Sequence, residues 1–393
     1  MCTGLKLKQY FAIKKKTDKF DLFLFFLDHY FTGNINQIGE KMDILKNPLG
    51  IIKIDHLEFC CDSPDTPTRN IFKKFGFLDS MINENENKIL MTQGQTKFLL
   101  NSDKNSYSSE YLKKHGEGVS TISFLVENAE HAIKEAHKRG AEIFSPLKEQ
   151  NDQYGTYLSG SIRGFGDVIN EFIQRPLENF RPGYKSLKQA NNMPLKTRVS
   201  RIDHLTNNVP RGELEKWVEF YERVYGFTVT RYFDIKGQKT GLESKVVQSF
   251  DGNIIIPINE PDKDNGKGQI EEFLERHNGP GVQHIALMTP DIVSTVSELK
   301  SRNIKFLDIP STYYEDIPKR DFKVTEDLKV LEKNQILVDG DPEGYLLQIF
   351  SDTYVGPLFF EVIQRKNHMG FGEGNFQALF NAIERDQMQR GVL

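Results

Sequence analysis

The chain has 393 residues, a length that suits two ordinary domains with buried cores. Its formal net charge of -4 excludes a strong general attraction to nucleic acid or anionic membranes, and no apolar run is long enough to span a bilayer. The three cysteines are too few for a disulfide scaffold, so we expect a protein of a reducing compartment, the cytoplasm.

Residues 1–41 differ in character from the rest of the chain. Three lysines precede an apolar stretch at 20–27, which superficially resembles a signal peptide. Asp21 and Asp28 interrupt this stretch, however, and no small-residue cleavage site follows it. We therefore reject secretion and interpret residues 1–41 as an N-terminal extension outside the native fold, with Met42 as the working start.

From Ile51 onward the chain repeats itself, because three short motifs occur twice in the same order. They are IDHL at 54–57 and 202–205, HGEGVSTI at 115–122 with NGPGVQHI at 278–285, and EFIQR at 171–175 with EVIQR at 361–365. We predict two structural copies: an N-terminal domain at 42–180 and a C-terminal domain at 200–365. A polar stretch at 181–199, with turn residues and no periodicity, is interpreted as a linker.

Each copy is expected to contain two smaller units, each made of a strand, a helix and several strands. In the second copy, apolar side chains recur at helical spacing in 212–225 and 291–302. Short alternating or apolar runs predict the strands, which lie around His204 and His284 and at 227–233, 245–250, 254–258, 304–307, 335–338, 345–350 and 359–364. The fold class is therefore α+β.

The repeated motifs also locate a candidate metal site. The second copy carries two imidazoles and one carboxylate on short strands, from His204, His284 and Glu361. A single strand histidine is more often structural, but this combination is a typical ligand set for a divalent transition metal. In the first copy the equivalent residues are His56, Thr121 and Glu171. Because threonine is a poor ligand for such metals, we predict that the first domain kept the fold and lost the site.

Strand alternation predicts which side chains could accompany the metal ligands. Phe359 shares a strand face with Glu361, and Gln348 shares one with Phe350 on the preceding strand. Gln283 directly precedes His284 and should point away from it, unless a bulge or the neighbouring Gly-Pro-Gly turn rotates it.

Residues 366–393 are predicted to form a lid helix. Three glycines at 370, 372 and 374 precede Asn375, a good N-cap residue, and apolar side chains from Phe376 onward recur at helical spacing. A glycine hinge before an amphipathic helix suits a lid, and a permanently docked helix is the alternative. The glycines do not match a nucleotide-binding loop.

Five motifs of the second copy together resemble one known family. They are IPINEP at 256–261, GPGVQHIAL at 279–287, LQIF at 347–350, FEVIQR at 360–365 and GFGEGNF at 370–376. The chain from about residue 49 to its C-terminus resembles the 4-hydroxyphenylpyruvate dioxygenase family. This resemblance implies the vicinal-oxygen-chelate fold, with two tandem domains, each of paired βαβββ modules forming an open barrel.

The resemblance also implies an activity in tyrosine and phenylalanine catabolism: the conversion of 4-hydroxyphenylpyruvate and O2 to homogentisate and CO2. It implies one Fe(II) per subunit, held by His204, His284 and Glu361. Such a ligand set leaves three coordination positions open, which suits a 2-oxo acid and dioxygen. We further expect a homo-oligomer that binds neither nucleic acid nor membrane.

The substrate pocket follows from the same resemblance. Its candidate catalytic residues are Ser244, Asn259, Gln269, Gln283 and Gln348. Its candidate substrate-binding residues are Phe350, Phe359, Phe371, Asn375 and Phe376. For each phenylalanine, ordinary core packing is the alternative, because the chain contains 29 of them.

Three alternatives stay open at this stage. 4-Hydroxymandelate synthase uses the same substrate and iron but hydroxylates the benzylic carbon; Asn259 and Phe350 are more similar to the ring-hydroxylating enzymes. An extradiol ring-cleaving dioxygenase shares the fold and ligand types, but the long C-terminal helix and GFGEGNF at 370–376 argue against it. A metal-free binding module of the same fold predicts a broken ligand set in both copies, whereas only the first is broken.

Overall fold

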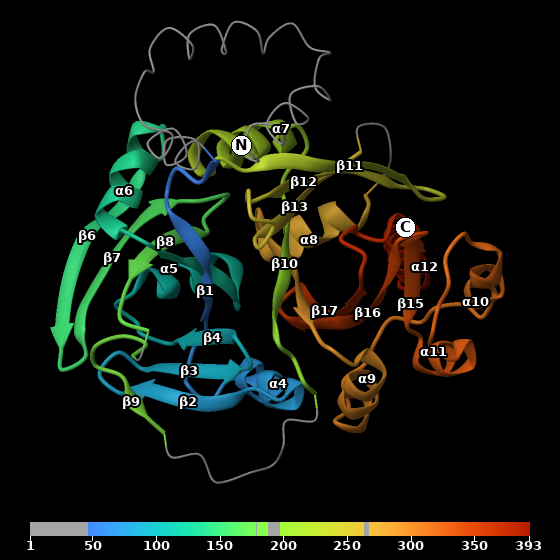
Figure 1. The fold of residues 1–393 in the computed structure, drawn as a ribbon, viewed down its shortest axis with the longest axis horizontal. Helices are drawn as coiled ribbons and strands as arrows, with labels where there is room; N and C mark the ends of the chain where they lie inside the picture. The colour runs from blue at the N-terminus through green and yellow to red at the C-terminus, as the bar shows by residue number, and fades with distance from the viewer. Residues whose placement is uncertain (1–45, 178, 188–196, 263–266) are drawn as a thin grey trace, which may run out of the picture. The chain divides into compact units, whose positions relative to one another are not determined.

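The two copies of the repeat fold into two mixed β-sheets, one from each half of the chain (Figure 1). The computed structural model describes residues 46–177, 179–187, 197–262 and 267–393, so the predictions about residues 1–41 and about a start at Met42 lie outside the described residues. Lys46–Leu393 belongs to one unit. Within the described part of the chain, no helix is both long and apolar enough to cross a membrane.

The first half contains two strand-helix-three-strand units joined by a short helix. In chain order its elements are β1 (Ile51–Cys60), α4 (Pro67–Phe75), β2 (Leu78–Asn83), β3 (Lys88–Gln93), β4 (Thr96–Asn101), α5 (Tyr107–His115), β5 (Gly118–Val126), α6 (Ala129–Lys138), β6 (Ile143–Asp152), β7 (Gly155–Arg163), β8 (Ile169–Gln174) and β9 (Lys185–Ser186).

The second half repeats this plan and adds helices. Its elements are β10 (Arg201–Asn208), α7 (Leu214–Phe220) with a π-helical end (Tyr221–Tyr225), β11 (Thr228–Lys236), β12 (Gly241–Gln248), β13 (Ile255–Pro261), α8 (Gln269–His277), β14 (Gly281–Met288), α9 (Ile292–Ser301), α10 (Thr312–Asp316), a 3-10 turn (Ile317–Lys319), α11 (Leu328–Asn334), β15 (Leu337–Asp341), β16 (Gly344–Val355), β17 (Leu358–Lys366) and α12 (Glu373–Gln389).

The strand order confirms the internal repeat. Apart from β9, the first sheet has the order β2-β3-β4-β1-β5-β8-β7-β6, and the second has β11-β12-β13-β10-β14-β17-β16-β15. The equivalent pairs also share direction, because β1 and β10 each run parallel to one neighbour and antiparallel to the other. These paired βαβββ units confirm the α+β, vicinal-oxygen-chelate fold.

The two halves share one apolar core. Aromatic residues of α4 pack against β17, and Phe75 lies 4.7 Å from Phe360 between ring centroids. The π-helical turn that follows α7 packs against the first half through Tyr225, whose ring lies 5.6 Å from Phe124. This shared burial stabilises the two sheets in one arrangement and so fixes the strands that carry the candidate site.

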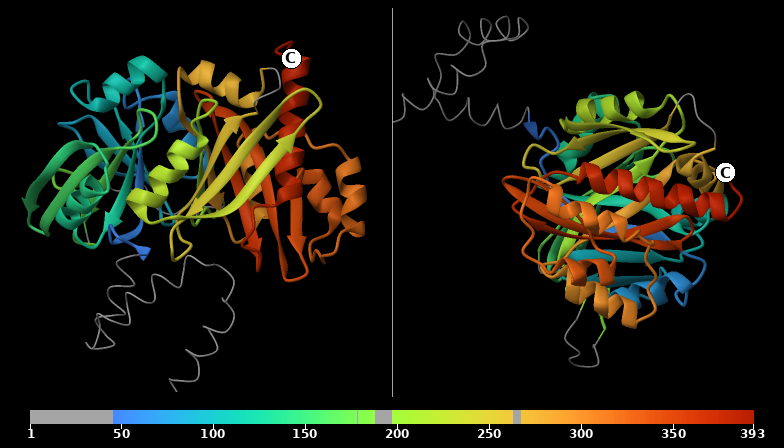
Figure 2. Two further views of the ribbon diagram at one scale, coloured as in Figure 1. Left: turned by 90° about the horizontal axis from the view of Figure 1, so that it is seen from above. Right: turned by 90° about the vertical axis from the view of Figure 1, so that its right-hand side faces the viewer.

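Helix α12 contacts β11 and β15, the two edge strands of the second sheet, and also α8 (Figure 2). The second sheet is curled, so a helix that reaches both of its edges closes the open side of the curl. The C-terminal helix is therefore docked over the concave face from which the candidate ligands project.

One predicted strand is absent from this fold, and several helices were not predicted. The run at 304–307 forms only an isolated bridge between Phe306 and Ser351, because its neighbours leave the sheet for α10 and α11. Helices α8, α10 and α11 were not predicted. The described start of the expected linker contains the short strand β9, which pairs with β2, and the buried Tyr184. The domain boundaries remain a prediction.

Candidate metal centre

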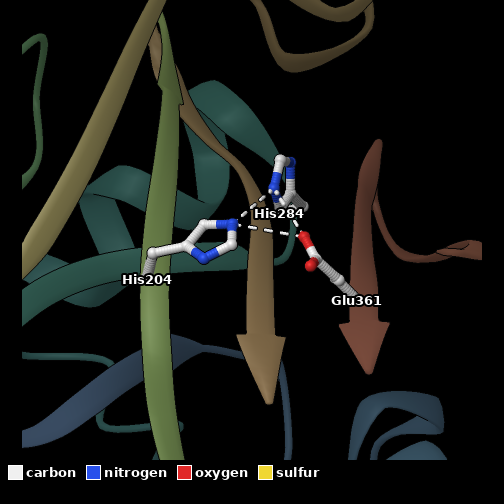
Figure 3. Close-up of side chains that lie close together, drawn as sticks. All are labelled: His204, His284 and Glu361. Atoms are coloured by element: carbon white, nitrogen blue, oxygen red, sulfur yellow. Dashed lines mark hydrogen bonds and ion pairs between the residues drawn. The ribbon is translucent and has the colours of Figure 1, made fainter. Parts of the chain in front are cut away.

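Three neighbouring strands hold the candidate ligands side by side. His204 lies on β10, His284 on β14 and Glu361 on β17, and the central strand β14 pairs with the other two (Figure 3). Ala286 is opposite both His204 and Glu361 in the register. The three strands therefore point their polar side chains into one buried space, in which each ligand residue is at most 7% exposed.

The ligand atoms converge on a common centre. His204 Nε2 lies 3.2 Å from Glu361 Oε2 and 3.4 Å from His284 Nε2. His284 Nε2 lies 3.5 Å from the same carboxylate oxygen. Among the described residues these three form the one group of His, Cys, Asp and Glu side chains whose ligand atoms gather within 4.8 Å.

Hydrogen bonds at the far side of each imidazole orient the rings. His204 Nδ1 donates to Asp203 Oδ2 at 2.9 Å, and His284 Nδ1 donates to Gln283 Oε1 at 3.0 Å. A carboxylate and an amide oxygen only accept, so Nδ1 is the donor in both rings and Nε2 faces the centre, where the neutral ring offers its lone pair to a metal ion. This is the tautomer that a metal-binding imidazole needs.

The electrostatics of the centre favour a bound cation. Burial disfavours charge on His204, yet the carboxylates of Glu361 and Asp203 outweigh it and raise the pKa of His204 to about 9. Burial lowers the pKa of His284. Burial alone would raise the pKa of Glu361, but the two imidazoles lower it to about 2.

The residues fit a divalent metal ion by their chemistry. Two imidazole nitrogens and one carboxylate oxygen meet in a buried space, and hydrogen bonds to Asp203, Gln283 and Gln348 already orient the three side chains. This donor set is typical of non-haem iron and of other divalent metals with open coordination positions.

A small cavity lies next to the three ligand atoms. Its free volume is about 40 Å³, and its walls come from β10, β11, β12, β13, β14, β16, β17 and the segment at 371–379. A cavity that holds benzene measures roughly 150 Å³, so an aromatic ligand enters only if a wall moves. The movable candidates are Phe371, Phe376 and Leu379, which reach the cavity from α12 and the loop before it.

Two polar atoms in this cavity lack hydrogen-bond partners within the described residues. They are Ser244 Oγ and Asn259 Oδ1, and both residues are at most 1% exposed. Burying such atoms without a partner is costly, so a native protein normally pairs them with a ligand or water. The cavity is therefore built to receive a molecule with polar groups.

Most of the predicted pocket residues surround this cavity. Its walls include Ser244, Asn259, Gln348, Phe350, Phe371 and Phe376. Phe359 lies beside it and stacks on the His284 ring, with centroids 4.8 Å apart. Their roles toward a substrate stay predictions.

Gln269 and Gln283 lie elsewhere. They line a second, larger cleft of about 550 Å³ between α8, α12 and the ends of β16 and β17. Alternation along the strand predicted that the Gln283 side chain points away from the centre, and it does so. It still touches the site, because its amide oxygen holds His284 Nδ1.

The expectation that Asn375 caps the last helix is wrong. Helix α12 begins at Glu373 after Gly372, whose φ of 69° is the left-handed conformation that favours glycine. Asn375 lies inside the first turn and is fully buried. It donates from Nδ2 to Gln348 Oε1 at 2.8 Å and accepts from Tyr313 Oη at 2.6 Å.

Several site residues were missed by the sequence reasoning. Cavity walls without a prediction are Thr206, Phe233, Val246, Pro257 and Leu379. Asp203 and Arg365 were also missed as partners of His204, although both lie in the repeated motifs IDHL and EVIQR. The repetition of an aspartate before each histidine was a usable signal.

The first half keeps the framework of the site but fills it differently. As in the second half, the histidine is hydrogen-bonded to the preceding aspartate, and His56 Nδ1 lies 2.9 Å from Asp55 Oδ2. Glu171, the equivalent of Glu361, is held by both oxygens to Arg181 Nη2 at 2.9 Å. His56 and Glu171 thus each have a partner of their own and are not paired with each other.

The comparisons with known proteins agree with this geometry. Residues 45–181 match the family model described as "Hydroxyphenylpyruvate dioxygenase, HPPD, N-terminal", and residues 201–349 match the Glyoxalase/Bleomycin resistance protein/Dioxygenase superfamily. The chain is 41% identical over 351 residues to Protein MelA of Shewanella colwelliana, which covers 88% of this chain and 99% of that protein. It is 38% identical to 4-hydroxyphenylpyruvate dioxygenase of Pseudomonas aeruginosa, over 88% of this chain and 97% of that protein.

A solved structure has a similar fold. It is a mutant of 4-hydroxymandelate synthase from Streptomyces coelicolor, with a TM-score of 0.76 and 25% sequence identity. The match covers 86% of this chain and 99% of that one.

Proposed function

The chain belongs to the 4-hydroxyphenylpyruvate dioxygenase family, and we propose that this dioxygenase uses Fe(II) to convert 4-hydroxyphenylpyruvate and O2 to homogentisate and CO2. The observation that carries the proposal is the convergence of His204 Nε2, His284 Nε2 and Glu361 Oε2 beside a cavity with unpaired polar atoms. The Fe(II) ion, when bound, supplies the activation of O2 and the oxidative decarboxylation of the 2-oxo acid.

The chain itself binds, orients and shields the substrate. Phe350, Phe371 and Phe376 provide apolar walls for an aromatic ring. Ser244 Oγ and Asn259 Oδ1, which have no hydrogen-bond partner among the residues that the structure describes, supply hydrogen-bonding positions for the polar groups of the substrate. Because α12 closes the open side of the sheet, it also excludes water from the reacting groups.

We propose that residues 366–393 act as a lid. The cavity of about 40 Å³ is too small for the substrate while Phe371, Phe376 and Leu379 line it. Movement of the segment that carries these three side chains enlarges it, and the glycines at 370 and 372 precede the helix where such a hinge is needed.

A second product is compatible with the same site. The likeness to a 4-hydroxymandelate synthase structure supports 4-hydroxymandelate, which forms from the same substrate and iron when the benzylic carbon is hydroxylated. The two reactions share the metal centre and differ in which carbon of the substrate reacts, so product analysis separates them.

The test is aerobic incubation of the purified protein with Fe(II), a reductant and 4-hydroxyphenylpyruvate. Oxygen uptake is followed with an electrode, and the aromatic product is identified by mass and retention time. We expect homogentisate. Formation of 4-hydroxymandelate would show that the protein catalyses the synthase reaction instead. Absence of oxygen uptake by protein with bound iron would contradict both the dioxygenase and the synthase proposals.

The first prediction concerns the three ligands. His204→Ala, His284→Ala and Glu361→Ala are each expected to abolish iron binding or turnover, because each removes one of three donor atoms. The matched control is His56→Ala in the first half, where the equivalent imidazole contacts Asp55 and Phe180. Turnover per folded molecule should be unchanged in this control, and an equal loss would contradict the division into scaffold and site.

We further propose one Fe(II) per subunit, a homo-oligomeric state and a cytoplasmic location. Metal analysis against protein concentration gives the stoichiometry, and light scattering after size exclusion gives the assembled mass. The first-half domain at 42–180 is proposed to serve as a scaffold, with residues 200–365 as the catalytic domain.

A further inference from the structure

Two of the three candidate ligands are connected to the segment that leads into α12, His204 through two further side chains and Glu361 through one. The first connection starts at His204. Asp203 holds the Nδ1 of this ring and is itself held by Arg365, which donates from Nε and Nη2 at 2.8 and 2.7 Å. The remaining Nη1 of Arg365 donates to the carbonyl oxygens of Gly370 at 2.6 Å and His368 at 3.1 Å.

The second connection starts at Glu361. Gln348 Nε2 donates to Glu361 Oε1 at 2.9 Å and to the carbonyl oxygen of Phe371 at 3.3 Å. Gln348 Oε1 accepts from Asn375 Nδ2 at 2.8 Å. The amide group of Gln348 thus lies between a candidate ligand and the first turn of α12.

The ring of Phe371 is a third contact between the segment before α12 and the candidate metal centre. It packs edge-on against His204, with ring centroids 5.4 Å apart. The third ligand, His284, is held differently, because its Nδ1 partner Gln283 lines the cleft beside α8. Residues 368–375 therefore form the outer support of His204 and Glu361 but not of His284.

The guanidinium group of Arg365 couples the orientation of Asp203 to the position of the backbone carbonyls that it binds. Its planar fork binds both oxygens of Asp203 in a fixed geometry, so it cannot turn without turning the carboxylate. A shift of the carbonyls at 368 and 370 therefore changes the orientation of Arg365, Asp203 and the His204 ring. Outer partners of metal-binding histidines typically affect metal affinity by about 10- to 100-fold.

The first half has a similar but simpler support around His56, in which Arg175 contacts Asp55 through Nη2 alone instead of through a fork. Arg175 Nη2 donates to Asp55 at 2.6 Å, and its Nη1 donates to the carbonyl oxygens of Pro176 at 3.0 Å and Asn179 at 2.5 Å. Phe180, from the segment that follows, packs edge-on against His56 at 5.0 Å. This half has no complete ligand set, so it is a natural control for effects on folding alone.

We propose that Arg365 and Asn375 are positioning residues that couple the docking of α12 to the metal affinity of the centre. The proposal rests on the proposed metal site and names a way in which that site is regulated. Metal binding stabilises the docked helix, and the docked helix holds His204 and Glu361 in the geometry that binds metal. Such coupling is reciprocal by thermodynamic necessity.

The test uses Co(II), whose visible absorption reports the geometry of its ligands, added to the full-length metal-free protein. Arg365→Lys keeps the charge and loses the fork, and we expect its Co(II) dissociation constant to rise by about 10-fold, with a changed spectrum. Arg175→Lys is the matched control and should bind Co(II) as the unaltered protein does. Asn375→Ala interrupts the second connection and should weaken binding in the same direction.

Amide hydrogen exchange in α12 supplies the second readout. Co(II) should slow exchange in α12 of the unaltered protein and of Arg175→Lys, and this response should be lost in Arg365→Lys. Unchanged affinity and an unchanged α12 response in both Arg365→Lys and Asn375→Ala would overturn the coupling. If His204→Ala also bound Co(II) normally, the proposed metal site itself would be wrong.

Discussion

Arg181 is the residue that most clearly separates the two halves. It donates to both oxygens of Glu171 and hydrogen-bonds Tyr157 Oη. In the first half a guanidinium therefore balances Glu171, whereas the equivalent carboxylate of the second half, Glu361, faces two imidazoles. Burial and the neighbouring carboxylate act on it in opposite directions, and the carboxylate prevails to raise the pKa of Arg181. The first half therefore carries its own cation.

We expect Arg181→Met to destabilise the protein by about 3 kcal/mol, because it leaves Glu171 partly buried without a counter-charge. Urea unfolding measures this change. The control is Arg163→Met, whose pair with Glu142 is exposed and should matter by less than about 1 kcal/mol. Turnover per folded molecule should stay the same in both variants, and a specific loss of turnover in Arg181→Met would contradict its structural role.

At the scale of the element, α12 and the loop before it form one wall of the cavity through Phe371, Phe376 and Leu379. Glu384 fastens the helix to the turn between β11 and β12, where its carboxylate accepts from the backbone N–H groups of Gln238, Lys239 and Thr240. Arg390 fastens it to α8 through Glu272 at 2.7 and 3.0 Å. Polar contacts thus hold the C-terminal part of the helix, Leu379 and Phe380 are buried along its middle, and Gly372 precedes its start.

Gly372→Ala tests whether the glycine that precedes α12 is needed for the helix to dock. Its φ of 69° disfavours any side chain, and an added Cβ would lie 2.8 Å from Gln348 Oε1. Such strain costs about 1 to 2 kcal/mol, so we expect amide exchange in α12 to become roughly 10-fold faster. Gly374→Ala is the control, because its Cβ would meet nothing closer than 3.5 Å and alanine favours the helix. Equal exchange in both variants would refute the role of Gly372.

Elements that are determined by the local sequence pattern could be predicted, and those that depend on distant partners could not. The pattern of IDHL and EVIQR predicted the strands that carry His204 and Glu361, because strand periodicity and repetition are visible in the sequence. The start of α12 was misplaced, since Asn375 is a good N-cap residue by type but is drawn into the helix by Gln348 and Tyr313. Those partners lie far away in sequence, so local preference could not predict them.

At the scale of the whole molecule, the repeat was foreseen but the contact between its halves was not. His115 of α5 and His277 of α8 stack face to face, with ring centroids 4.6 Å apart. His277 Nε2 accepts from Tyr111 Oη at 3.0 Å, and His115 Nε2 pairs with Asp167 at 2.9 Å. Nothing in the separate motifs indicates that these side chains meet, because only the packing of the two sheets brings them together.

This contact makes the stability of the protein sensitive to acid. Burial, and then the proximity of His115, lowers the pKa of His277 from an ordinary 6.5 to about 4. In the unfolded chain the ring takes up a proton near pH 6.5, whereas in the folded chain it resists until about pH 4. The stabilising contribution is thus fully present above pH 6.5 and is lost as the pH falls toward 4.

Between pH 7 and pH 5 we expect a loss of about 2 kcal/mol in the free energy of unfolding from His277. Urea unfolding at both pH values measures it, and His277→Gln should reduce the acid sensitivity by that amount because glutamine does not titrate. His131→Gln, at an exposed histidine on α6, should keep the full sensitivity. If His277→Gln lost as much stability as the unaltered protein over this range, the acid sensitivity would have to originate outside the contact between the two halves.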